Sequence, residues 1–366
     1  MSDSDTRSAQ RIVDGTTWSD FCRTLESAGQ VILGDGTPTD AFNRAEGFRY
    51  LSRITRAALE TFVENADPRA PVLQRVVHET VKMGADNPDN YYQNAAISGA
   101  YTYRIRGRRG TVHTLSFSTQ NGHYGQGNGM PPSGHLEGSA LEINPDGTFE
   151  IILSCEEQPG NWLPMKPDTG TLIVRQTFLD RDNEERADLV IERLDGPSEP
   201  TPVTPHAIDE GLVTAANLVN GAAMIFASWA KGFMEHTNQL PEFDRDLSNR
   251  FGGDPNIVYY HSYWRLAPNE ALVIEVTPPA CDHWNFQLNN HWMESLDYRY
   301  FTIHVNKYTA QYEADGSVRI VVAHEDPGVA NWINTVGHSR GTMCLRWVRA
   351  NTHPQPATRV VKLGDL

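Results

Sequence analysis

The residues best suited to chemistry lie in one stretch in the second half of the chain, Asp282 to Asn289. Apolar and polar side chains alternate along it, so a strand would place an imidazole and three amides on one face. Such an imidazole can act as a general acid or base while the amides orient a ligand's oxygens, although a solvated outer face explains the pattern equally well. The apolar positions are Trp284, Phe286 and Leu288, and the polar positions are His283, Asn285, Gln287 and Asn289.

Two neighbouring segments, 259–265 and 291–304, add further His, Tyr, Trp and Arg side chains. A pocket for an aromatic or alicyclic, oxygen-bearing small molecule needs such side chains. We predict that either His283 or His261 moves the proton, and that Asp282 orients a histidine. In the same prediction Tyr260 and Arg299 stabilise developing oxygen charge, and the substrate contacts Trp264, Trp284, Trp292, Asn285 and Tyr298.

The same region holds six of the thirteen histidines, between His261 and His338, which raises the question of a metal site. The zinc spacing HExxH does not occur, and His283 and His291 are too far apart to share a turn of helix. Dinucleotide, P-loop, PLP and haem signatures are missing from the contexts that they require. We predict no metal and no cofactor, although separate strands could still assemble a metal site.

A long internal repeat organises the chain, because the stretch 145–178 is echoed at 314–347. Both copies contain an Asp-Gly turn, an alternating strand, an acidic pair, Asn-Trp, Gly-Thr and a last strand with an arginine. The similarity extends back to Asp86 and Asp254. This duplication predicts two β units of the same architecture.

Features that occur in both copies are interpreted as architectural, because both copies must fold. Arg175 and Arg346 belong to this class, and we expect each to pair with a carboxylate. Features of one copy are where function can have been added, which favours His261 and His283. The other shared residues are Glu156, Glu157, Asn161 and Trp162 in the first copy, and Glu325, Asp326, Asn331 and Trp332 in the second.

One motif resembles the nucleophile elbow of serine hydrolases, since Gly337 to Gly341 fits G-x-S-x-G with Ser339 at its centre. The motif activates a serine only between a strand and a helix. Here the residues that follow alternate like a strand, and the equivalent turn of the first copy has Asp168. We interpret the motif as a surface turn.

The composition is that of an ordinary globular protein, with 366 residues and a formal net charge of -15. This charge argues against nucleic acid and anionic membranes as partners, because both require a positive face. The four cysteines have no CxxC spacing, and neither a signal peptide nor a membrane span is recognised. We expect a cytoplasmic protein with a small-molecule substrate, which can be a homo-oligomer.

The order of hydrophobic periods predicts a mainly β fold with helical decorations, in which helices precede each of two jelly-roll-like sandwiches. Within it we expect helices at 40–65, 72–83 and 208–234, and a strand at 140–143. The predicted regions are a disordered tail (1–16), an N-terminal helical region (17–85), a first β-sandwich repeat (86–196), a linker and helical region (197–253) and a second β-sandwich repeat (254–366).

Several motifs together resemble the DUF1214 family, which implies a helix-decorated, jelly-roll-like β-sandwich and transfers no catalytic residue. The two late motifs are the more specific ones. They are CDHWNFQLNNHWMESLDYR (281–299) and DPGVANWI (326–333), and the earlier ones are RAEGFRYLSRITR (44–56), GADNPDNYYQ (84–93) and YRIRGRRG (103–110).

The missing signatures narrow the expected function. Without a nucleophile, nucleotide or redox motif, we expect a cofactor-independent lyase that uses acid/base chemistry on a hydrophobic, oxygen-bearing substrate. Two alternatives remain open: a non-catalytic module that binds a carbohydrate or lipid-like ligand, and an oligomeric structural protein.

Overall fold

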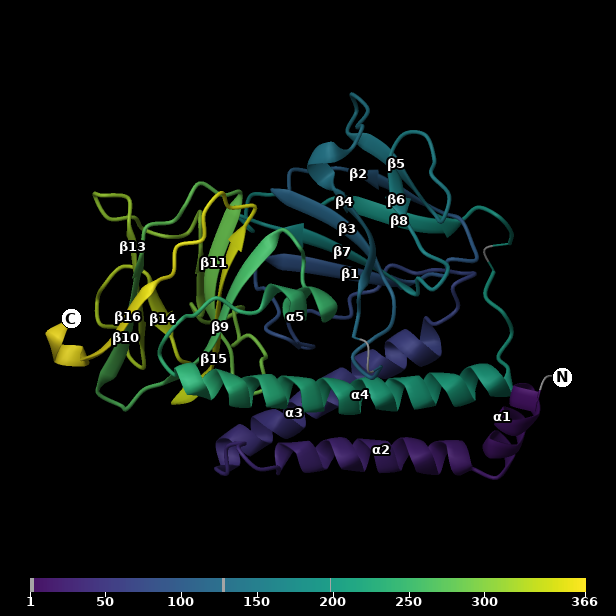
Figure 1. The fold of residues 1–366 in the computed structure, drawn as a ribbon, viewed down its shortest axis with the longest axis horizontal. Helices are drawn as coiled ribbons and strands as arrows, with labels where there is room; N and C mark the ends of the chain where they lie inside the picture. The colour runs from purple at the N-terminus through teal and green to yellow at the C-terminus, as the bar shows by residue number, and fades with distance from the viewer. Residues whose placement is uncertain (1–2, 127–128, 198) are drawn as a thin grey trace.

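The computed structural model describes residues 3–126, 129–197 and 199–366. Two β sandwiches stand side by side on a layer of helices, and the long helix α4 runs beneath both of them (Figure 1). The mainly β fold and the duplication predicted from the sequence are confirmed.

Each sandwich has eight strands in two four-stranded sheets, and the strand order of the two sandwiches is the same. We call β1-β7-β3-β4 and its counterpart β12-β11-β15-β9 the inner sheets, and β6-β5-β2-β8 and β14-β13-β10-β16 the outer sheets. The first repeat comprises β1 (Asn90–Ala96), β2 (Tyr103–Arg108), β3 (Thr114–Gln120), β4 (Pro132–Glu137), β5 (Thr148–Ser154), β6 (Trp162–Pro164), β7 (Thr171–Thr177) and β8 (Asp188–Arg193).

The second repeat reproduces these strands one for one, so that β9 matches β1, β11 matches β3 and β15 matches β7. Its strands are β9 (Ile257–Arg265), β10 (Glu270–Val276), β11 (His283–Leu288), β12 (His304–Asn306), β13 (Val318–Ala323), β14 (Trp332–Asn334), β15 (Arg340–Val348) and β16 (Ala357–Lys362).

Alternation along the strands builds one core inside each sandwich. In the first, Phe117 of the inner sheet meets Phe149 of the outer sheet with ring centroids 6.4 Å apart. In the second, Trp284, Phe286 and Leu288 point inward as their period of two predicts, and the polar residues of β11 point the opposite way. The interior of each sandwich is therefore apolar.

The polar faces of the two inner sheets are turned toward each other. Asn256 and Arg349 of the second repeat both contact Glu137 of β4. The loop before β1 reaches across to β11, where Asp89 accepts a hydrogen bond from His283 at 3.1 Å. The side chains that leave each sandwich on this face are buried between the two repeats.

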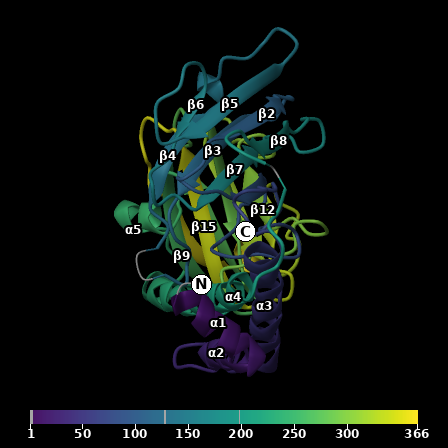
Figure 2. The same ribbon diagram turned by 90° about the vertical axis from the view of Figure 1, so that its right-hand side faces the viewer.

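The helical layer closes one side of this junction (Figure 2). Helix α4 packs on α1, α2 and α3, and it contributes Ala215, Val219 and Phe226 to their shared core. By length and hydropathy the stretch Pro205–His236 is the one helix in the described chain that could cross a membrane, and 44% of its most apolar window is buried inside the protein. The helices are α1 (Asp3–Val13), α2 (Thr16–Ile32), α3 (Ala41–Leu59), α4 (Pro205–Phe233) and α5 (Arg245–Arg250), with short η1 (Glu60–Glu64), η2 (Gly138–Ala140), η3 (Met234–His236) and η4 (Leu363–Asp365).

Three local predictions were wrong. The tail expected to be disordered forms α1, because Arg11 pairs with Asp209 of α4 at 3.0 Å; residues 1–2 of that tail lie outside the described residues. The segment 72–83 is extended instead of helical, since its backbone pairs with β1 at Gln74 and Asn94. The strand expected at 140–143 is an irregular loop, and residue 198 of the predicted linker also lies outside the description.

The G-x-S-x-G segment lies where the turn interpretation placed it. Ser339 immediately precedes β15, and no helix follows it. Gly337 has a positive φ of 76°, which suits a turn that reverses the chain into a strand.

Candidate functional site

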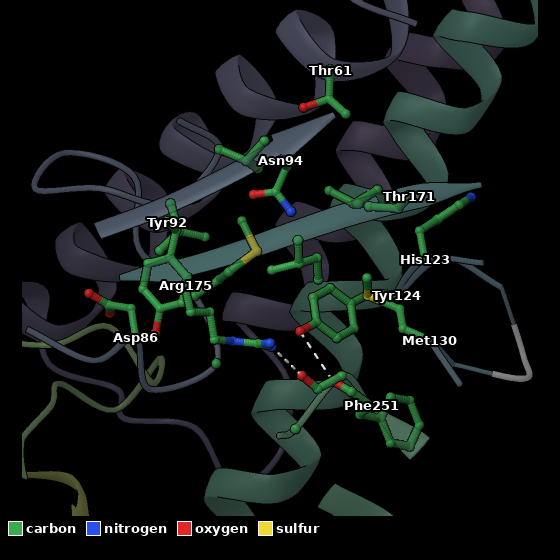
Figure 3. Close-up of a pocket in the computed structure, with 18 of the residues that line it drawn as sticks. Thr61, Asp86, Tyr92, Asn94, His123, Tyr124, Met130, Thr171, Arg175 and Phe251 are labelled. Carbon is green, nitrogen blue, oxygen red and sulfur yellow. Dashed lines mark hydrogen bonds between the residues drawn. The ribbon is translucent and has the colours of Figure 1, made fainter. Parts of the chain in front are cut away.

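A cavity of about 330 Å³ lies between the two inner sheets and the helical layer. Its walls come from β1 and β7 of the first repeat, β9 and β15 of the second, α4, and the loops before β1 and after β3 (Figure 3). Apolar atoms make up most of the wall. The apolar side chains include Phe62, Val76, Val77, Met83, Met130, Leu218, Phe226, Trp229 and Phe251, and the polar ones include Asn94, His123, Tyr124, Arg175, Tyr259, His261 and Arg346.

Each repeat contributes one tyrosine and one arginine at equivalent positions. Tyr92 of β1 is the register partner of Arg175 in β7, and Tyr259 of β9 is the register partner of Arg346 in β15. The Tyr92 hydroxyl accepts the backbone N–H of Asn87 at 3.1 Å, and the Tyr259 hydroxyl is bonded in the same way by the residue five places before it, at 3.4 Å. The duplication therefore places two Tyr–Arg pairs in one cavity.

The two arginines differ in their partners. Arg346 is 3% exposed and donates to the side-chain oxygens of Asn285 and Gln287 at 3.2 and 2.5 Å, and also to the carbonyl of Ala85. Arg175 donates to one protein acceptor among the described residues, the carbonyl of Gly252 at 2.8 Å. The acceptors of Arg346 satisfy most of its donors, whereas most donors of Arg175, which lines the cavity, have no acceptor among the described residues.

Neither arginine has the carboxylate partner expected from the sequence, as judged over the residues that the structure describes. Two guanidinium groups and one carboxyl group, that of Asp86, line this mostly apolar cavity, so its described wall carries more positive than negative charge although the whole chain is acidic. Their charges also act on the hydroxyls of Tyr92 and Tyr259, where burial raises the pKa and the arginines oppose that rise. A cavity of this kind favours an anionic or oxygen-rich ligand.

His261 of β9 lies in the wall beside these groups. Its ring stacks on Phe233 and on Tyr259 with centroid distances of 5.5 Å, and its Nδ1 has no hydrogen-bond partner. Burial, reinforced by the charge of Arg346, lowers the pKa of His261 to about 3. The imidazole is therefore neutral near pH 7 and can exchange a proton only with a ligand in the cavity.

The opposite end of the cavity is formed by the loop after β3. Tyr124 donates to the carbonyl of Phe251 at 3.3 Å, and burial raises the pKa of its hydroxyl to about 12 (Figure 3). His123 accepts the backbone N–H of Gly125 through Nδ1 at 3.0 Å, and burial lowers the pKa of its imidazole. Both side chains are uncharged at neutral pH and can act as hydrogen-bonding groups.

Two of the predicted site residues, His283 and Asn285, lie between the repeats but behind the cavity. Both donate to Asp89, at 3.1 and 2.9 Å. Burial would raise the pKa of Asp89, but His304 and His283 lower it well below its usual range. These residues join the repeats, and Asn285 also holds Arg346 in place.

Four predicted residues lie in apolar cores and do not line the cavity. Tyr260, Trp264 and Trp284 point into the second sandwich, on the opposite face of the sheet from His261. Trp292 packs against Ile32 and Gly47 of the helical layer and donates its indole N–H to the carbonyl of Asn43 at 2.8 Å. The four residues therefore do not line this cavity, and on β9 the alternation of side chains explains why Tyr260 and Trp264 lie on the face opposite His261.

The three remaining predicted residues lie outside the cavity wall. Asp282 is half exposed and pairs with Arg349. Arg299 forms a bidentate ion pair with Asp297, with contacts of 2.9 and 2.7 Å. Tyr298 stacks under the Lys82 ammonium at 4.6 Å. Of the ten residues predicted from the sequence, His261 is the one that the structure places in the cavity wall.

One group of three side chains in the described chain has ligand atoms close enough to hold a single metal ion: His135, Glu137 and Asp254. Glu137 already accepts hydrogen bonds from His135 at 2.8 Å and from Asn256 at 2.9 Å, and it pairs with Arg349 at 2.6 Å. A guanidinium this close opposes the binding of a second cation. The group is better explained as an ion-paired contact between the repeats.

The cavity residues missed from the sequence are the two Tyr–Arg pairs and the segment His123–Tyr124. The signal for the pairs was present, because both arginines were recognised as shared by the two copies. They were interpreted as architectural because the sequence does not show that the two copies face each other. Shared residues on facing sheets meet at a common site.

The fold and the site define a duplicated β-sandwich protein with a mostly apolar cavity between its repeats. The model of the family described as "Protein of unknown function (DUF1214)" matches residues 90–177 and 266–352, one segment in each repeat. The chain belongs to this family, as its motifs indicated.

Two solved structures are similar to this chain. An uncharacterized protein from Burkholderia cenocepacia is 53% identical, with a TM-score of 0.96 over 98% of this chain and 100% of its own. The VPA0106 protein from Vibrio parahaemolyticus shares the fold at 12% identity, with a TM-score of 0.51 over 93% of this chain and 100% of its own. No curated protein matches the chain.

Proposed function

We propose that this protein is a small-molecule enzyme of the lyase type that acts on a hydrophobic, oxygen-bearing substrate in the cavity between its repeats. One observation carries the proposal: an arginine that has no ion pair among the described residues and an imidazole with an unbonded ring nitrogen share a mostly apolar cavity. A lyase needs a proton carrier and a group that stabilises negative oxygen, and it needs no nucleophile.

The apolar and polar parts of the cavity wall bind different parts of the substrate. The apolar side chains of Phe62, Val76 and Phe226 accommodate the body of the substrate, whose burial supplies most of the binding free energy. Arg175 and the neighbouring Tyr92 form the polar side and hold its oxygens. Because the wall is mostly apolar, hydrogen bonds from a charged donor are stronger here than on the surface.

His261 is the proposed proton carrier. In the empty cavity its pKa of about 3 makes it a weak base. Burial is the main cause of this low pKa and the charge of Arg346 adds to it, so an anionic substrate in the cavity would raise the pKa and make the imidazole a better base. Tyr124, whose hydroxyl is kept protonated by a pKa of about 12, donates to the carbonyl of Phe251 and can accept a hydrogen bond at the other end.

The test begins with a thermal-shift screen of aromatic and alicyclic alcohols, ketones and acids, since a ligand that binds the native state raises its melting temperature. Val76→Trp, which fills part of the cavity, serves as the blocked control. Compounds that bind the wild type and not the blocked variant are then incubated with wild type and with His261→Gln, and their consumption is followed by mass spectrometry. Binding in both proteins with turnover in the wild type only supports the proposal.

The low pKa of His261 favours a second candidate, a binding protein without catalysis. In that case the cavity holds the ligand and the neutral imidazole serves only as a hydrogen-bonding group. Ligands that stabilise both proteins and are consumed by neither would support this candidate and contradict the lyase.

A further inference from the structure

We propose that the ligand of the cavity is a monocarboxylate with an apolar body, and that Arg175, not Arg346, binds its carboxylate. The inference rests on the proposed function, because it assigns the substrate class of the same cavity. It follows from a difference between the two repeats on the strand that faces each arginine.

In the second repeat, the strand opposite the arginine holds it in place. Asn285 of β11 is the register partner of Arg346, and Gln287 lies two residues further along the same face. Both are fully buried and both accept from the guanidinium, with Ala85 supplying a third acceptor from the loop before β1. With five N–H donors and three protein acceptors, Arg346 has little capacity left for a ligand.

In the first repeat, the same two positions are serines. Ser116 of β3 is the register partner of Arg175, and Ser118 donates to or accepts from the imidazole of His135 at 3.0 Å. A serine side chain is too short to reach along a guanidinium as an amide does. Arg175 therefore extends to the cavity end, where its one acceptor among the described residues is the carbonyl of Gly252 (Figure 3).

A guanidinium with free, parallel N–H groups is the group that binds carboxylate in a bidentate manner. Here it lies between Tyr92, its register partner, and the loop Phe251–Gly252, and the rest of the wall is mainly apolar. The part of the wall that the structure describes contains no lysine and no glycine-rich run at a helix start, so a phosphate would meet too few donors for its charge.

The cavity volume limits the size of the acid. One water occupies about 30 Å³ in the liquid, and covalently bound atoms are closer together, so a cavity of about 330 Å³ takes roughly ten to fifteen non-hydrogen atoms. Benzoate, cyclohexanecarboxylate, octanoate, cinnamate and 4-phenylbutyrate have about nine to twelve non-hydrogen atoms, which is just below and within the lower half of this range. Each of them has a neutral primary amide of nearly the same shape.

The experiment measures the affinity of each acid and of its amide by calorimetry, with the wild type, Arg175→Gln and Arg175→Lys. Arg106→Gln, on the exposed face of the first outer sheet, is the matched control. We expect at least one acid to bind about tenfold or more tightly than its amide, and Arg175→Gln to remove that preference, because a charge-assisted bond is lost. Arg175→Lys keeps the charge without the planar fork and retains part of the preference.

Two results would overturn the inference. If amides bind as tightly as their acids and Arg175→Gln changes neither, the cavity binds small molecules as proposed but is not selective for carboxylates. If no acid in the series binds, and the Val76→Trp block changes no ligand found in the broader screen, both the inference and the proposed function are wrong. The melting temperatures of the unliganded variants are measured as well, so that a variant that fails to fold is recognised. If Arg175→Gln does not fold, the acid preference of Arg175→Lys relative to wild type decides whether Arg175 binds the carboxylate.

Discussion

Arg175 and Arg346 occupy equivalent positions in the two repeats, yet their surroundings give them different roles. Arg346 is enclosed by three acceptors from β11 and the loop before β1, and it ties the second repeat to the first. Arg175 has one backbone acceptor and opens into the cavity. The comparison teaches that a duplicated residue can become structural in one copy and available for a ligand in the other, according to the strand beside it.

The largest expected effect is on stability, from Arg346→Gln. The substitution leaves the oxygens of Asn285, Gln287 and Ala85 buried with weakened or missing donors, so we expect a loss of about 3 to 5 kcal/mol in the free energy of unfolding. Arg175→Gln gives up one bond to a backbone carbonyl and should cost about 1 kcal/mol. Urea unfolding of the two variants measures the difference, and equal losses would contradict the comparison.

The second prediction concerns Asn285, the residue of β11 that makes the surroundings of Arg346 different from those of Arg175. Asn285→Ser should destabilise the protein by about 2 to 3 kcal/mol, because Asn285 accepts from Arg346 and donates to Asn87 and Asp89 inside the protein. Its counterpart variant, Ser116→Ala, should change the free energy of unfolding by under about 0.5 kcal/mol. A loss as small in Asn285→Ser as in Ser116→Ala would show that Arg346 does not depend on β11.

The third prediction concerns pH and His261. Its pKa of about 3 in the folded protein lies below the ordinary value of about 6.5, so the unfolded chain binds a proton first as the pH falls, and stability is lost between these two values. From pH 7.5 to pH 5 this group alone should remove about 2 kcal/mol, at roughly 1.4 kcal/mol per pH unit below 6.5. The groups facing the ring are Phe233, Phe243, Tyr259, Cys344 and Arg346.

The measurement compares urea unfolding of wild type and His261→Phe at several pH values. We expect the wild-type stability to fall more steeply below pH 6.5, so that the two curves converge as the pH drops. Other buried histidines, such as His291, are present in both proteins and cancel in the difference. Parallel curves would mean that His261 is not buried as a neutral base.

The smallest effect on stability, and the sharpest for the comparison, comes from making the first repeat resemble the second. Ser116→Asn places an amide opposite Arg175, where Asn285 stands opposite Arg346. We expect the affinity for a carboxylate ligand to fall about tenfold, because the new amide oxygen competes for the guanidinium, and the unfolding free energy to change by under about 1 kcal/mol. Calorimetry with the tightest-binding acid tests this prediction. An unchanged affinity would show that Arg175 does not bind the ligand.

The sequence predicted the framework because period-two alternation and Asp-Gly turns act locally. The polar and apolar faces of β11 and the turn at Ser339 were predicted correctly from neighbouring residues alone. Helix α1 was missed because its stability comes from a distant ion pair between Arg11 and Asp209, which no local pattern contains. Local sequence patterns therefore predicted the strands and turns that depend on neighbouring residues, and missed a helix that depends on a tertiary contact.

The site was predicted less well for two physical reasons. Tyr260 and His261 are neighbours on one strand, so a site that used both contradicted the alternation already applied to residues 282–289. The second reason is that the cavity forms only where the two inner sheets face each other and the helical layer closes one side of the space between them. Docking of one repeat on the other depends on loop residues such as Asn87 and Gly252, and no periodicity encodes it.

The most direct test of the central claim is a crystal structure of the wild type with a brominated form of the tightest-binding acid, such as 4-bromocinnamate. We predict an anomalous bromine peak inside the cavity near Phe62, Val76 and Phe226, and the carboxylate within hydrogen-bonding distance of the Arg175 guanidinium. A bromine peak elsewhere on the protein, or a carboxylate bound to Arg346 while Arg175 keeps only the carbonyl of Gly252, would contradict the account.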